Sequence, residues 1–186
     1  MTRFYKARPD EGDVEWLAYV DHLYIRSTLD VVLGAHVGDS SSWGSSPLIV
    51  VQRTGDRGEP LASVPMPWLG SFTIAFKGEA IEAARPILAP HCELRALPTI
   101  DGTPIAVVVP PWVDGALDEA ESDILRFPSS GRIMHVKKLA LHPRAEAYGV
   151  LRLAEDSRGP TYFREDVVNE LVRVGLAVGT HFHPET

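Results

Sequence analysis

The chain has 186 residues, of which 45% are hydrophobic and 23% are charged, a composition typical of a globular protein and not of a disordered one. Its formal charge of −7 disfavours a general nucleic-acid binder, because a negative surface repels the phosphate backbone. The single cysteine, Cys92, excludes an intrachain disulfide and a cysteine-rich zinc site. Mixed charges in residues 1–16 and the lack of an apolar run near ~20 residues predict a cytoplasmic protein with no membrane partner.

The first part of the chain predicts short extended segments separated by polar breaks. Residues 16–20 and 23–25 are expected to be extended or mixed, and the β-branched run 48–51 is expected to be a buried strand. The Ser- and Gly-rich stretch 38–47 is typical of a loop, and 53–60 carries turn chemistry.

The middle of the chain contains the first strong helical pattern. Residues 78–88 place apolar side chains at helical spacing, but Pro86 predicts a kink or an early stop. The alternating segment 92–97 and the apolar run 105–109 are expected to be strands.

The last part predicts more strands and a closing helix. Strands are expected at 133–141, 149–153 and 161–163, and a helix at 165–174, with Gly175 as a left-handed cap. Because strands follow one another without intervening helices, the sequence predicts an α+β fold with a largely antiparallel sheet and two or three helices packed on it.

Three groups of residues are candidates for chemistry. His181 and His183 lie two apart, so on a strand both rings would face one side and could hold a metal, although a solvated tail is the simpler reading so near the end of the chain. Cys92 follows His91, but neighbours on a strand point to opposite faces, which favours a buried structural cysteine over a thiol nucleophile. No phosphate-binding glycine loop and no G-x-S-x-G turn occurs in the sequence.

The third group is acidic. Carboxylates gather between the strands at 105–109 and 133–141, at Asp114, Asp118, Glu119, Glu121 and Asp123. Asp118 is expected to cap a short helix, whose first turn the following acidic residues would stabilise. The functional alternative is a surface that receives a basic partner.

From about Leu61 onward the order of motifs resembles one known family. The motifs are WLGSFTIAF, EAIEAARPIL, CELRALP, IAVVVPPWVDGALDEAESDI, FPSSGRIMHVKKLAL, GVLRL and TYFREDVVNELVRVGLAVGTHF. In this order they are similar to the immunity protein 11-like family of bacterial polymorphic toxin systems. The chain departs from the family pattern at PPW before VDGALD and in GVLRL, which lacks a phenylalanine. The resemblance implies one domain, 1–186, with a variable portion 1–60 and a family-like core 61–186.

The resemblance also implies a function without catalysis or cofactor: binding and neutralising a cognate toxin encoded nearby, with a homodimer possible. Trp43 and Trp112 are candidate anchors for that interface, and the acidic group would supply its rim if the toxin is basic. The sequence leaves two alternatives open. One is a small metal-dependent hydrolase that uses His181, His183 and a nearby carboxylate; the other is a non-catalytic regulatory subunit of a homo-oligomer.

Overall fold

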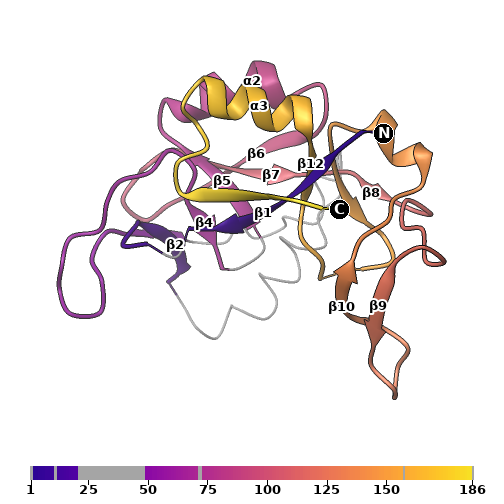
Figure 1. Cartoon of the computed structure of the whole chain (residues 1–186). Helices are drawn as coiled ribbons and strands as arrows, with labels where there is room; N and C mark the ends of the chain where they lie inside the picture. The colour runs from indigo at the N-terminus through magenta and orange to yellow at the C-terminus, as the bar shows by residue number, and fades with distance from the viewer. Residues whose placement is uncertain (1, 11, 21–48, 71–72, 157, 186) are drawn as a thin grey trace.

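The computed structural model describes residues 2–10, 12–20, 49–70, 73–156 and 158–185. These residues form two sheets of five and six strands, a two-stranded hairpin, two α-helices and a short 3₁₀ helix (Figure 1). Most neighbouring strands are antiparallel, and the parallel exceptions are the pairs β8–β11 and β2–β4. The α+β prediction with largely antiparallel pairing is therefore confirmed.

The five-stranded sheet joins the two ends of the chain. Its strands in spatial order are β13 (Thr180–Pro184), β1 (Phe4–Pro9), β12 (Tyr162–Arg164), β11 (Val150–Leu153) and β8 (Trp112–Val113). β1 pairs antiparallel with β12 on one side and with β13 on the other. The C-terminal segment, expected to be a solvated tail, is thus a paired strand, because β1 offers it a complete edge.

The six-stranded sheet collects the middle of the chain. Its strands in spatial order are β3 (Ile49–Gln52), β2 (Trp16–Tyr19), β4 (Trp68–Leu69), β5 (Thr73–Lys77), β7 (Ile105–Val109) and β6 (Glu93–Leu97). All five residues of β7 are buried, as its continuous apolar run predicts for a strand covered on both faces.

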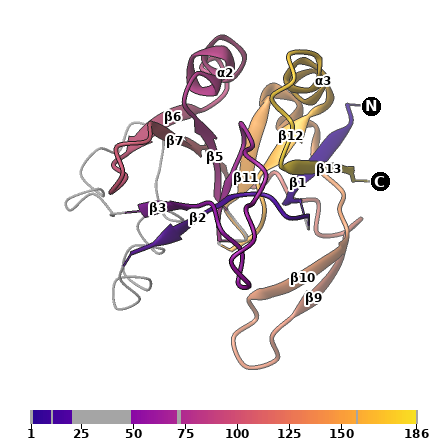
Figure 2. The ribbon, with the colours of Figure 1, turned by 90° about the vertical axis from the view of Figure 1, so that its left-hand side faces the viewer.

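Two helices cover the same side of the molecule and contact each other (Figure 2). α2 (Ala80–Leu88) packs on β5 and β6, whereas α3 (Glu165–Arg173) packs on β12 and β1. Their buried faces share one apolar cluster with strands of both sheets, and a second cluster gathers side chains of the six-stranded sheet alone. α2 continues for two residues beyond Pro86, so of the predicted kink or early stop the early stop is wrong.

α3 ends as the sequence predicts. Gly175 has φ of 76°, a left-handed conformation that strains any residue with a Cβ atom. Its N–H bonds the carbonyl of Val172 at 3.0 Å, and the N–H of Leu176 bonds that of Leu171 at 2.9 Å. This bonding is the Schellman motif, which returns the chain to the core at Leu176.

The hairpin of β9 (Asp123–Arg126) and β10 (Ile133–Lys138) projects from the five-stranded sheet at the end opposite the helices (Figures 1 and 2). Its inner residues Ile124, Ile133 and Val136 lie against a third apolar cluster, which also receives the 3₁₀ helix η2 (Pro143–Ala147) through Ala145. An isolated two-stranded hairpin is marginally stable in water, so this packing holds it in place.

Among the described residues, neither α-helix has the length and apolar character that crossing a bilayer would need.

Candidate partner-binding surface

The acidic residues predicted as a binding rim lie in the connection from β8 to β9. Asp118 caps this connection as expected, since its Oδ1 accepts hydrogen bonds from the N–H groups of Ala120 at 3.1 Å and Glu121 at 3.2 Å. The expected helix is nevertheless wrong, because the segment forms only turns before β9. Ser122 ends the turn: its hydroxyl accepts the N–H of Ala140 at 2.9 Å and donates to the carbonyl of Ala140 at 3.2 Å.

The acidic residues differ in whether a basic side chain of the hairpin pairs with them. Glu119 pairs with Arg126 at 2.7 Å, and Asp123 lies 3.9 Å from the ammonium of Lys137. The carboxylates of Asp114 and Glu121 are exposed and have no partner within the described part of the chain. Two of the predicted rim carboxylates are therefore available to a cationic partner, and two are already engaged by bases of the hairpin.

The two predicted tryptophan anchors have different outcomes. Trp43 lies outside the described residues. Trp112 is half-buried in β8, and its ring lies 5.2 Å from the guanidinium carbon of Arg152 on the neighbouring strand β11. Arg152 is only 4% exposed, and burial lowers the pKa of its guanidinium to about 10. Part of the Trp112 ring therefore stabilises a buried cation, so this residue links the core to the acidic loop.

A second contact fixes the start of the acidic loop. The N–H of Gly115 donates to Oε1 of Glu155 at 2.6 Å, which joins the loop to the β11–β12 connection. Gly115 has φ of 63°, and a Cβ atom there would lie 2.8 Å from a guanidinium nitrogen of Arg144. Arg144 itself donates to the carbonyl of Asp114 at 2.8 Å. The left-handed backbone favours glycine here, and a side chain would also have to displace the Arg144 guanidinium.

A cleft of about 800 Å³ lies between the hairpin and the strands behind it. One wall comes from the turn and first half of β10, and the other from β1 and the β11–β12 connection. Four cationic side chains line it: Lys6, Arg8, Arg132 and Arg158. None of the four side chains has an ion pair or hydrogen bond with another described residue. Sequence reasoning missed this feature, because its residues come from three distant segments.

Charge in this cleft is only partly balanced. Lys6 is half-buried, and both burial and the neighbouring charge of Arg8 lower the pKa of its ammonium. Asp156 is the half-buried acidic group nearby, and its pKa is raised chiefly by burial, against the influence of Lys6 and Arg152. Both shifts disfavour the charged forms, as expected for ionisable groups withdrawn from water at the floor of a cleft.

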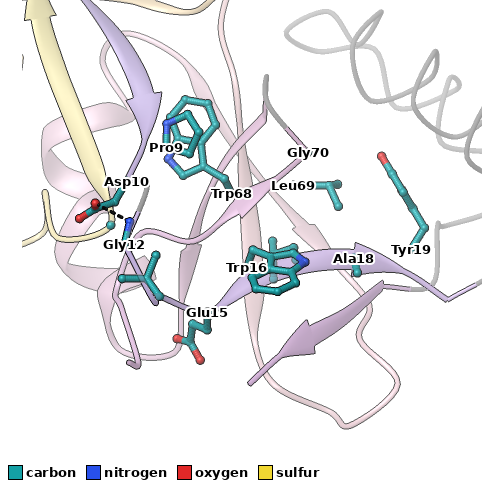
Figure 3. Close-up of a pocket in the computed structure, with 13 residues that line it drawn as sticks. Pro9, Asp10, Gly12, Glu15, Trp16, Ala18, Tyr19, Trp68, Leu69 and Gly70 are labelled. Carbon is teal, nitrogen blue, oxygen red and sulfur yellow. Dashed lines mark hydrogen bonds between the residues drawn. The ribbon is translucent and has the colours of Figure 1, made fainter. Parts of the chain in front are cut away.

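A second pocket, of about 480 Å³, lies beside β2 and the ends of β1 and β4 (Figure 3). Its walls are mainly apolar, with Trp16 and Trp68 as the largest side chains. The hydroxyl of Tyr19 is buried there, and this burial raises the pKa of the phenol to about 12. The Glu15 side chain points away from the Trp16 ring (Figure 3). A pocket lined in this way would bind an apolar part of a ligand better than an ion.

The structure also gives the positions and contacts of the histidine and cysteine candidates. His181 and His183 lie on one side of β13 with ring centroids 6.3 Å apart, as their spacing predicts, and Nε2 of His181 lies 3.3 Å from Oδ1 of Asp10. Across the described residues, no three His, Cys, Asp or Glu side chains gather closely enough to hold a metal ion. Cys92 is buried, its thiol lies 3.5 Å from the carbonyl of Leu88, and burial raises its pKa to about 12. The predicted burial of Cys92 is therefore confirmed.

In comparisons with known proteins, the chain matches no family model, and no curated protein sequence matches it.

Proposed function

We propose that this chain is a cytoplasmic immunity protein that binds a cognate toxin, encoded nearby, and neutralises it by covering or locking its active site. The observation that carries the proposal is the hairpin β9–β10, which projects from the fold and presents apolar side chains to solvent. Leu125, Phe127 and Met134 are exposed by 44%, 45% and 45%. Large apolar side chains grouped on one projecting element are typical of a protein–protein interface.

The surroundings of the hairpin supply the polar rim that such an interface needs. The connection that leads into β9 carries the exposed carboxylates of Asp114 and Glu121, and the cationic cleft adjoins the apolar centre, since Phe127 and Met134 also line it. A specific interface of ordinary size buries ~1,600 Å² in total, and an apolar centre within a polar rim is its usual anatomy. Charges of both signs favour one partner over others, because a wrong partner brings like charges together.

The test is a binding titration with the product of the adjacent gene. The double variant Leu125→Ser/Phe127→Ser removes the exposed apolar centre without touching the inner face of the hairpin. We expect it to weaken the complex by at least about tenfold, since truncating a buried hot spot costs ~2 kcal/mol or more.

A matched control is Ile100→Ser, which removes an apolar side chain that is 57% exposed and distant in sequence from the hairpin. This control should bind like the unmodified chain. If both variants bind the partner equally well, the hairpin is not its docking surface.

A further inference from the structure

The hairpin contributes more than exposed side chains, because β10 also has a free edge. β10 pairs with β9 on one side, and no other strand within the described chain pairs with it. Four residues of β10, from Ile133 to Val136, line the cleft. The unpaired backbone groups of an edge strand are a template for an added strand.

The chemistry of the cleft selects which strand would fit. Of the cationic side chains of the hairpin, Arg132 lines the cleft, whereas Arg126 and Lys137 pair with Glu119 and Asp123. Lys6, Arg8 and Arg158 add positive charge from the opposite wall. Glu155 and Asp156 also line the cleft, so four cations stand against two carboxylates, a formal charge of +2. The cleft is therefore complementary to an anionic segment.

Phe127 and Met134 lie in the same cleft lining and are both about half exposed. Apolar side chains beside cations suit a peptide that alternates acidic and apolar residues, because neighbouring residues of a strand point in opposite directions. A nucleic acid would gain from the cations but not from a free strand edge.

We propose that an extended, acidic segment of the protein partner adds to the edge of β10 and occupies this cleft, with its carboxylates paired to Arg132, Arg158, Arg8 and Lys6. Main-chain hydrogen bonds to β10 give affinity, and the cations give specificity for acidic sequences. This inference rests on the proposed function, since it names the chemistry of the partner at the surface already described.

The first test uses a fluorescein-labelled peptide that alternates glutamate and valine, titrated with the full chain at low salt. The double variant Arg132→Glu/Arg158→Glu changes two exposed side chains of the cleft. Its control is Arg57→Glu/Arg85→Glu, which makes the same change in net charge in the 53–60 loop and on α2. We expect about tenfold or more weakening in the cleft variant only, because each reversal replaces an attraction by a repulsion.

Two further probes separate strand addition from general anion binding. Methylating alternate backbone nitrogens of the peptide removes hydrogen-bond donors without changing its charge. If the peptide adds to the edge of β10 as a strand, this methylation should abolish binding. A single-stranded oligonucleotide and inorganic tripolyphosphate should bind weakly. No binding of the acidic peptide, equal binding by the cleft and control variants, indifference to methylation, or tighter binding of either polyanion would each overturn the proposal.

The same two variants, titrated with the product of the adjacent gene, keep the two proposals apart. A partner that binds both variants equally removes the cleft from the interface but leaves the immunity function standing. A neighbouring product that does not bind the unmodified chain, while the acidic peptide does, removes the immunity function and leaves the cleft as a peptide-binding site.

Discussion

An ion pair between Glu15, the residue before β2, and Lys77 at the end of β5 gives a prediction whose size can be worked out from the structure. Glu15 is 2% exposed, and its Oε1 accepts hydrogen bonds from the N–H of Val64 at 2.9 Å, from the hydroxyl of Ser63 at 3.2 Å and from the ammonium of Lys77. The Lys77 side chain is 16% exposed, and its ammonium also donates to Ser63 at 2.7 Å. Burial lowers the pKa of this ammonium.

The substitution Glu15→Ala removes the acceptor of three groups, the N–H of Val64, the hydroxyl of Ser63 and the ammonium of Lys77. The buried N–H of Val64 loses its acceptor, at a cost of ~1–3 kcal/mol. Breaking a buried ion pair costs ~3–5 kcal/mol in general. Because the Lys77 ammonium can move toward solvent, we expect a total loss of ~3 kcal/mol in the free energy of unfolding, or ~6–12 °C in Tm for a chain of this size.

Urea unfolding followed by circular dichroism measures this loss as a lower midpoint at an unchanged slope. Glu15→Ala/Lys77→Met should lose less than Glu15→Ala alone, since it leaves no unpaired buried charge, with a coupling energy of ~1–3 kcal/mol. Glu82→Ala, which breaks an exposed pair with Arg85, should leave the unfolding free energy unchanged. A loss below ~1 kcal/mol for Glu15→Ala, or additive effects in the double variant, would show that the ion pair contributes little to the stability of the fold.

Three further predictions concern the binding surface, the thiol and the helix cap. Asp114→Lys/Glu121→Lys should slow association with a basic partner several-fold at low salt and little at high salt, as stopped-flow fluorescence would show, while Glu82→Lys should not. Cys92 should resist iodoacetamide at pH ~8 in the folded chain and react once the chain is denatured. Burial raises the pKa of its thiol to about 12 in the folded chain, against an ordinary value of 9. The stability that the buried thiol contributes is therefore complete below pH 9 and is lost as the pH rises toward 12. Gly175→Ala should lower the free energy of unfolding by ~1 kcal/mol in urea titration, and an unchanged midpoint would contradict the left-handed cap.

The sequence predicted the elements in which buried apolar residues recur at regular spacing along the chain. α3 and Gly175 follow from helical spacing and a left-handed cap, and β7 follows from its uninterrupted apolar run. β1 was missed, because it is short and is held as a strand by pairing with β12 and β13 from the far end of the chain. β13 was missed because only its pairing with β1, across nearly the whole chain, makes it a strand.

The sequence predicted which acidic and aromatic residues could belong to the candidate surface, but not how they are arranged on it. The acidic residues are visible in the sequence, but the pairing of Glu119 with Arg126 and of Asp123 with Lys137 depends on the strand pairing of the hairpin. Likewise, the half-burial of Trp112 against Arg152 follows from a parallel pairing between β8 and β11 that no local pattern encodes. The pairing of strands that are distant in the sequence decides which charged side chains remain unpaired, and the periodicity of the sequence does not reveal this pairing.

The most direct test of the central claim is to mix the purified chain with the purified product of the adjacent gene, and to measure both the stoichiometry of the complex and the partner's toxic activity. We expect a tight one-to-one complex in which that activity is abolished in proportion to the chain added. A partner that stays active at saturation, or that forms no complex with the chain, would contradict the claim that this protein neutralises a toxin by binding it.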